Sequence, residues 1–181
     1  MSKSLLITGG AASGKSRWAA TYYSACDYVL YLKAGGEVDN DTLRRIEFSC
    51  THNGVEWDIV TTGKIDLAGE ITDHKFVIFD SISSYASVVM DKMCPGEEIP
   101  DESVKKAVEK RIIEGIMNVR RKVDDNGGSM IVITLETGLS FTPENKRQAI
   151  FREIIGTVNQ RIANTSEEVY FSASGIQFKI K

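Results

Sequence analysis

A glycine-rich segment near the start of the chain constrains the fold more than any other feature. Residues 9–16 read GGAASGKS and directly follow the apolar run SLLIT. The pattern G-x-x-x-x-G-K-[ST] is satisfied by Gly9, Gly14, Lys15 and Ser16. In such a loop the glycines turn backbone N–H groups toward a phosphate, and the lysine adds a full positive charge at the terminal phosphates. The predicted nucleotide-binding residues are Gly9, Gly10, Ala11, Ala12, Ser13, Gly14, Lys15 and Ser16.

Apolar runs and helical periodicities alternate along the rest of the chain. Strands are predicted at residues 4–8, 28–32, 55–62, 75–80 and 129–135, and helices at 16–25, 41–50, 83–93 and 103–126. A further long helix is predicted to begin at Pro143 with Thr142 as its N-cap, and two strands around Ser174-Gly175 close the chain as a hairpin. The alternation predicts an α/β fold: a P-loop NTPase-like, mostly parallel sheet flanked by helices, with a C-terminal antiparallel hairpin. Residues 1–181 are expected to form a single nucleotide-binding domain.

Composition limits the classes of protein to which the chain can belong. The 181 residues carry a net charge of −3 and contain no Lys/Arg-rich block, which argues against a nucleic-acid-binding surface. No segment reaches the roughly 18 apolar residues needed to span a membrane, and Met1–Thr8 is too short for a secretory signal. The three cysteines lack metal-ligand spacing, so reduced thiols in a cytoplasmic protein are expected.

Two carboxylates follow apolar strands at the edge of the sheet where α/β folds bind ligands. Asp80 ends the run FVIFD, where it would emerge beside the phosphate loop and hold Mg²⁺ together with the hydroxyl of Ser16. The alternative is that Asp80 caps a helix, since DSISS is also a good helix start. Glu136 ends the run MIVITLE and could orient a substrate hydroxyl or hold a metal-bound water, the alternative being a polar strand end.

The segment LETGLSFTPENKRQAIFREIIGTVNQRIA, residues 135–163, carries a long and specific motif. It is similar to N-E-V-G-x-G-[IV]-V-P-E-N followed by F-R-D-x-x-G-x-x-N-Q. These patterns belong to the bifunctional adenosylcobinamide kinase/adenosylcobinamide-phosphate guanylyltransferases of cobalamin biosynthesis. The residues in register are Glu136, Gly138, Pro143, Glu144, Asn145, Phe151, Arg152, Gly156, Asn159 and Gln160. The terminal hairpin also looks like that of this family.

The front of the chain is similar to the same family. ITGGAASGKSRWA resembles T-G-G-x-R-S-G-K-S-x-x-A, with Ala12 where an arginine is usual. The segment YLKAGGEVDNDTLRRI resembles a second motif of this family. The residues that match it are Tyr31, Asp39, Arg45 and Ile46. The resemblance implies a homo-oligomer, expected to be a trimer, and two reactions. A nucleoside triphosphate, GTP or ATP, phosphorylates the aminopropanol hydroxyl of adenosylcobinamide; GTP then donates GMP to that phosphate through a histidine that carries GMP covalently.

One departure from the family bears on the second reaction. The family's GMP-carrying histidine lies three residues after an Arg-Ile pair, and that position here is Ser49. A serine hydroxyl without a base is a poor nucleophile, so the chain favours a retained kinase and leaves guanylyl transfer open. His52 would share a helical face with Ser49 and is the candidate replacement acceptor, the alternative being an exposed histidine in a turn at Asn53-Gly54. His74 precedes a buried strand and is expected to be structural.

Three functions follow from these patterns. The first is an adenosylcobinamide kinase whose active residues are Lys15, Ser16, Asp80 and Glu136. The second is a non-catalytic relative that binds a nucleotide or a corrinoid. The third is a P-loop kinase for another small alcohol. The sequence does not decide between GTP and ATP, because base-reading residues lie outside the phosphate loop.

Overall fold

The computed structural model describes residues 3–96, 101–138, 143 and 145–181. Its strands are β1 (Lys3–Gly9), β2 (Val29–Ala34), β3 (Trp57–Thr62), β4 (Phe76–Asp80), β5 (Ser129–Ile133), β6 (Glu168–Ala173) and β7 (Ile176–Lys179). Its α-helices are α1 (Lys15–Tyr22), α2 (Asn40–Asn53), α3 (Ile82–Met93), α4 (Glu102–Asp125) and α5 (Lys146–Thr165). None of the helices in these ranges is both long and apolar enough to cross a lipid bilayer.

All the strands form one sheet in the order β3-β2-β4-β5-β1-β6-β7. Neighbouring strands run parallel from β3 to β6, and β7 alone pairs antiparallel, with β6. The predicted α/β fold with a C-terminal hairpin is therefore confirmed. Because β1, β4 and β5 are adjacent and parallel, the chain leaves all three at the same edge of the sheet, which is where the candidate site forms.

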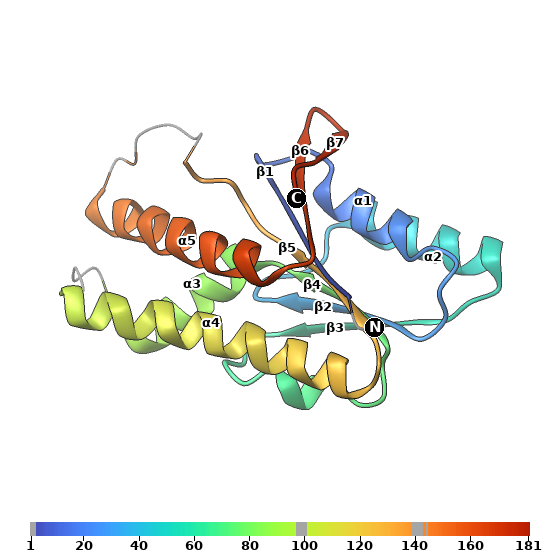
Figure 1. Ribbon diagram of the computed structural model, residues 1–181, viewed down its shortest axis with the longest axis horizontal. Coiled ribbons are helices and arrows are strands. Elements are labelled where there is room, and N and C mark those ends of the chain that lie inside the picture. Colours follow the sequence, from blue (N-terminus) through green and yellow to red (C-terminus); the bar gives the residue numbers. More distant parts are fainter. Residues whose placement is uncertain (1–2, 97–100, 139–142, 144) are drawn as a thin grey trace.

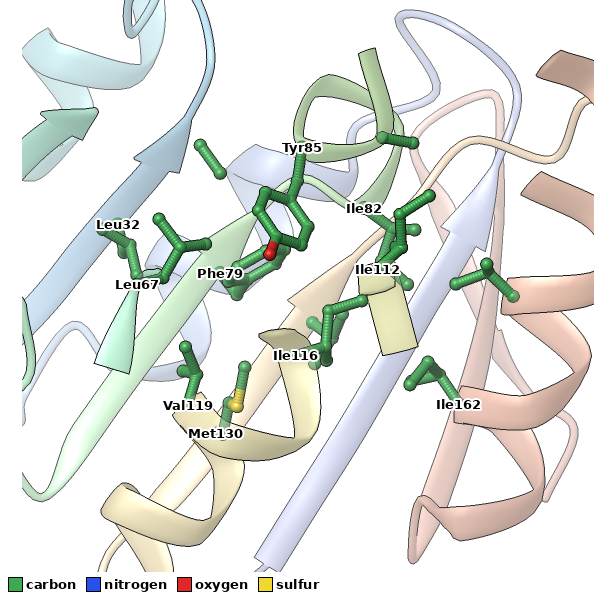
Figure 2. Close-up of a cluster of buried hydrophobic side chains, with 14 of the residues drawn as sticks. Leu32, Leu67, Phe79, Ile82, Tyr85, Ile112, Ile116, Val119, Met130 and Ile162 are labelled. Carbon is green, nitrogen blue, oxygen red and sulfur yellow. The ribbon is translucent and has the colours of Figure 1, made fainter. Parts of the chain in front are cut away.

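Helices cover both faces of the sheet, with α1 and α2 on one side and α3, α4 and α5 on the other (Figure 1). Alternate residues of a strand therefore face different helices: Leu5 and Ile7 pack with the α1–α2 side, and Leu6 with the α3–α5 side. This explains why β1, β4 and β5 read as continuous apolar runs. On the larger side, Figure 2 shows side chains of α4 among those of the sheet and α3, namely Ile112, Ile116, Val119, Phe79, Ile82 and Tyr85.

The predicted start of the last helix is wrong. The helix begins at Lys146, and its N-cap is Asn145, whose Oδ1 accepts a hydrogen bond from the backbone N–H of Gln148 at 2.8 Å. Pro143 lies before the helix, and Thr142 lies outside the described residues. Asparagine favours the N-cap position at least as strongly as threonine, so propensity alone does not distinguish Asn145 from the predicted Thr142.

Glu168 ties the C-terminal hairpin to the first strand and should make stability depend on pH. Its carboxylate lies 2.8 Å from Lys179 Nζ, from Lys3 Nζ and from Tyr170 Oη. These hydrogen bonds, that of Lys179 first, lower the pKa of Glu168 from its ordinary 4.5 to about 2. The stabilisation is therefore present above a pH of about 4.5, where the unfolded chain would also be ionised, and is lost as the pH falls toward 2.

We expect Glu168→Gln to lower the free energy of unfolding at pH 7 by about 1 kcal/mol, since the lysine partners are solvent-accessible and the ion pairs are screened. The difference from the unsubstituted protein should shrink as the pH approaches 2. Urea unfolding at several pH values measures it. The control is Glu70→Gln, which removes an ion pair with the exposed Lys64. A deficit for Glu168→Gln that is independent of pH would contradict this account.

Candidate nucleotide site

The loop between β1 and α1 has the backbone that the glycine pattern predicts. Gly14 is the N-cap of α1 and has a left-handed φ of +95°, a conformation that L side chains rarely adopt. Gly9, where β1 ends, has φ +151°, and a Cβ at this position would lie 2.2 Å from the carbonyl oxygen of Ser172. Both glycines are thus required by the path of the loop, which passes directly against β6.

Lys15 lies buried inside this loop. Its Nζ donates to three acceptors of the loop: Gly9 O at 3.1 Å, Gly10 O at 2.5 Å and Ser13 Oγ at 3.4 Å. Burial lowers the pKa of Lys15 below its ordinary value, and the negative charge of Asp80 opposes this shift. A bound phosphate would add negative charge beside the ammonium group and favour its charged form further.

The C-terminal hairpin supports the loop from outside, a contact that the sequence analysis missed. The carbonyl oxygen of Ser13 accepts hydrogen bonds from Ser172 Oγ at 2.6 Å and from the Gly175 backbone N–H at 3.0 Å. Gln177 Nε2 in turn donates to Ser172 Oγ at 3.2 Å. Because one carbonyl of the loop is held by two donors of the hairpin, β6 and β7 help to fix the conformation of the phosphate loop.

Asp80 lies at the end of β4 and is linked to Ser16. Its Oδ2 accepts a hydrogen bond from Tyr31 Oη at 2.6 Å and lies 3.2 Å from Lys33 Nζ. Burial and the charge of Asp80 raise the pKa of Tyr31, whereas a side-chain hydrogen bond with Ser16 lowers it. Tyr31 is therefore a neutral phenol that joins the Ser16 hydroxyl to the Asp80 carboxylate. The sequence predicts the two ends of this chain of contacts, Ser16 and Asp80, but indicates no role for Tyr31 or Lys33.

The alternative that Asp80 is a helix cap is wrong. The N-cap of α3 is Ser81, whose Oγ accepts a hydrogen bond from the backbone N–H of Ser84 at 3.2 Å. The Asp80 carboxylate belongs instead to the group that lies beside the phosphate loop.

Glu136 lies three residues beyond the end of β5 at Ile133 and next to the phosphate loop. Its backbone N–H donates to Gly9 O at 3.0 Å, the same oxygen that accepts from Lys15 Nζ at 3.1 Å. Its carboxylate Oε1 accepts a hydrogen bond from the Gly138 backbone N–H at 2.9 Å. One carbonyl oxygen therefore connects Glu136 and Lys15, two residues that the sequence analysis placed in a common site.

Asn159 of α5 fixes the segment that leads from β5 to Glu136. Its Oδ1 accepts from Thr134 Oγ1 at 2.7 Å, and its Nδ2 donates to Leu135 O at 2.9 Å. The side chain is buried and uses both ends of its amide on this segment. The family motif contains Asn159, but the sequence offers no signal for these partners.

His52 lies on a different surface. The helix α2 continues to Asn53 and ends at Gly54, so His52 is helical and not in a turn. It lines a groove of about 580 Å³ between α1 and α2 together with Ser49, and its ring stacks on that of Phe48 with centroids 5.8 Å apart. No residue of the phosphate loop, 9–16, lines this groove.

His74 also lies away from the phosphate loop. Its ring is buried, with Nε2 2.8 Å from Asp58 Oδ2 of β3 and Nδ1 3.3 Å from Thr72 Oγ1. These contacts connect the chain before β4 to β3, which lies on the other side of β2 in the sheet, as expected of a structural residue.

The arrangement contains the parts that phosphoryl transfer requires. A buried ammonium group lies within a loop suited to phosphate, and a carboxylate linked to a hydroxyl offers oxygen ligands for a divalent cation. Glu136, whose backbone is bonded to the same loop, carries a second carboxylate that could accept a proton from an attacking hydroxyl.

Comparison with known proteins agrees with this chemistry. Residues 5–180 match the family described as CobU: Cobinamide kinase / cobinamide phosphate guanyltransferase. The chain is 29% identical over 180 residues to the "Bifunctional adenosylcobalamin biosynthesis protein CobU" of Escherichia coli (strain K12), covering 98% of this chain and 99% of that protein. The protein of the same name from Salmonella typhimurium is 28% identical over 180 residues, with the same coverage of both chains.

Among solved structures, the chain resembles a unique ATP synthase subunit, NeqB, from Nanoarcheaum equitans, with a TM-score of 0.55 and 14% identity. The match covers 93% of this chain and 45% of that one. At this identity the likeness concerns the fold alone, and it supports a P-loop NTPase-like arrangement of the sheet and helices.

Proposed function

The chain belongs to the cobinamide kinase / cobinamide phosphate guanyltransferase family, and on that premise we propose that it phosphorylates the aminopropanol hydroxyl of adenosylcobinamide with GTP or ATP. The observation that carries the proposal is the shared carbonyl oxygen of Gly9, which joins the Lys15 ammonium group to the backbone of Glu136. The residue that supplies a cation for the donor's phosphates and the residue that would supply a carboxylate for the acceptor's hydroxyl thus meet at one oxygen of the loop.

The side chains beside the loop fit Mg²⁺. The Ser16 hydroxyl and the Asp80 carboxylate are joined through Tyr31, and oxygen ligands of these kinds are those that Mg²⁺ prefers. Both the Tyr31 and the Lys33 contacts of Asp80 are made by Oδ2. Ser16 and Asp80 would hold the ion, which when bound neutralises negative charge on the phosphates of the donor.

The proposed phosphoryl transfer forms one bond and breaks one, and residues of this chain handle the proton and the charge. The oxygen of the acceptor hydroxyl forms a bond to the γ-phosphorus of the donor, and the bond from that phosphorus to the β–γ bridging oxygen breaks. The nucleoside diphosphate leaves with the bridging oxygen. Glu136 takes the proton of the hydroxyl, while Lys15 stabilises the negative charge of the phosphoryl group in transfer.

Acceptor-dependent release of nucleoside diphosphate tests the kinase. The protein is incubated with Mg²⁺ and either GTP or ATP, first with adenosylcobinamide and then with other small alcohols. The proposal expects release that depends on adenosylcobinamide. Release with another alcohol alone would support a different kinase, and tight nucleotide binding without release under any condition would support a non-catalytic relative.

Guanylyl transfer through position 49 is not part of the proposal, because a serine hydroxyl is a poor nucleophile and Ser49 lines a groove to which no residue of the phosphate loop contributes. With GTP labelled at the α-phosphorus, we expect no protein-bound GMP. The matched variants are His52→Ala and Ser49→Ala, which alter neighbouring positions of one groove. An acid-labile adduct that His52→Ala abolishes and Ser49→Ala leaves intact would contradict this expectation and assign the acceptor role to His52.

A further inference from the structure

Two cavities meet at Glu136, on the side of the sheet that α5 covers. One, of about 250 Å³, extends between α5 and the strands β1 and β6, and Leu6 and Thr8 line it. The other, of about 420 Å³, extends along α5. The residues that line both cavities are Glu136, Gly156 and Gln160. We call the joined space the Glu136 recess.

Thr8 lines the recess and carries an unsatisfied polar atom. The residue is 7% exposed, and its buried Oγ1 has no hydrogen-bond partner among the residues that the structure describes. Leaving a buried hydroxyl unpaired is unfavourable unless some other group satisfies it. Thr8 directly precedes Gly9 in β1, so this hydroxyl lies one residue from the phosphate loop.

Gly156 keeps the recess open. It lies in the interior of α5, where glycine is less favourable than alanine. A Cβ at this position would meet no atom within 4 Å, so close packing does not require a glycine there. Since Gly156 lines both cavities, a side chain at this position would project into the space where they join.

We propose that the Glu136 recess binds the hydroxyl-bearing arm of the acceptor, with Thr8 Oγ1 as its hydrogen-bond partner and Gly156 as the residue that admits it. The inference rests on the proposed kinase function. The ligand class is a narrow arm that carries an alcohol, because the recess offers the hydroxyl of Thr8, the amide of Gln160 and the carboxylate of Glu136 as polar partners. Arg152 and Glu153 add one charge of each sign to the cavity along α5. The alcohol would then lie between Glu136 and the end of β1 that leads into the phosphate loop.

Gly156→Ala tests the proposal, because it should stabilise the helix while it obstructs the recess. We expect its melting temperature to rise by about 2–4 °C and its KM for adenosylcobinamide to rise about 10-fold or more. The KM for the nucleotide should stay within about twofold of the unsubstituted protein, since the loop is untouched. The matched control, Thr157→Ala, changes the adjacent residue of α5, which lines neither cavity.

Thr8→Val is the second variant, because it removes the hydroxyl at nearly constant volume. Loss of one hydrogen bond to the arm should raise the KM for adenosylcobinamide about 3- to 10-fold without lowering the melting temperature. Equal acceptor KM values for Gly156→Ala and Thr157→Ala would overturn the proposal.

The role of the recess in binding can be tested separately from the kinase function. Titration calorimetry with adenosylcobinamide measures binding without turnover, and Gly156→Ala should bind about 10-fold more weakly than Thr157→Ala. If the unsubstituted protein binds adenosylcobinamide but does not phosphorylate it, the kinase function fails while the binding comparison still decides the recess. Equal affinities of the two variants would overturn the recess in that case as well.

Discussion

Replacing Lys15 by alanine is expected to lower kcat for adenosylcobinamide phosphorylation on the order of 10²–10³-fold or more. The ammonium group is the positive charge inside the phosphate loop, where it contacts Gly9 O, Gly10 O and Ser13 Oγ. Its removal leaves the transferring phosphoryl group without a charged partner in a site of low dielectric constant. The measurement is acceptor-dependent release of nucleoside diphosphate at saturating concentrations of both substrates.

The fold should survive this substitution, because the glycines and the hairpin contacts of Ser13 also hold the loop backbone. Circular dichroism and thermal unfolding check this point. Lys110→Ala is the control, since Lys110 is 77% exposed on α4, which covers the face of the sheet opposite to α1. Normal turnover by the Lys15 variant would exclude a catalytic role for the loop lysine.

Asp80→Asn is expected to lower kcat on the order of 10²-fold and to raise the Mg²⁺ concentration needed for half-maximal rate about 10-fold or more. The substitution keeps the size of the side chain but removes the charge that pairs with Lys33 and that would hold the metal ion with Ser16. Titration of the rate with MgCl₂ at fixed nucleotide concentration measures the effect.

Asp58→Asn is the matched control for this substitution. Asp58 also lies on a strand of the sheet, β3, but it is 64% exposed and pairs with His74. We expect its Mg²⁺ dependence to equal that of the unsubstituted protein. A Mg²⁺ dependence of Asp80→Asn that matches the control would contradict the proposed metal role of Asp80.

The features that could be predicted from the sequence are those that short local sequence patterns determine. The apolar runs of β1, β4 and β5 identify strands covered on both faces, and the glycine–lysine–serine spacing identifies a phosphate loop. Asp80 and Glu136 could be placed near that loop because each follows a buried strand, and the ends of parallel strands meet at one edge. Local patterns and one topological rule were therefore enough to assemble most of the candidate site.

The features that could not be predicted depend on which strands lie side by side. Lys33 faces Asp80 only because β2 pairs with β4 in that register. A charged residue in the otherwise buried run VLYLKA is the one signal that could have indicated it. The contacts of Ser172 and Gly175 with Ser13 join residues about 160 positions apart, on the order of the whole chain, and no local pattern encodes such a pair.

The start of α5 illustrates a different limit. Two good N-caps occur three residues apart, and propensity alone does not choose between them. The end of α2 shows the same limit: Asn53-Gly54 correctly indicated that the helix would stop, but not that His52 would still be helical.

We propose that this chain phosphorylates the hydroxyl of adenosylcobinamide and does not transfer GMP to the resulting phosphate. Mass spectrometry of the corrinoid after incubation with Mg²⁺ and GTP, with ATP in parallel, tests it most directly. The account predicts adenosylcobinamide phosphate as the product. GDP-linked cobinamide would contradict the second half of the claim, and unmodified cobinamide with both nucleotides would contradict the first.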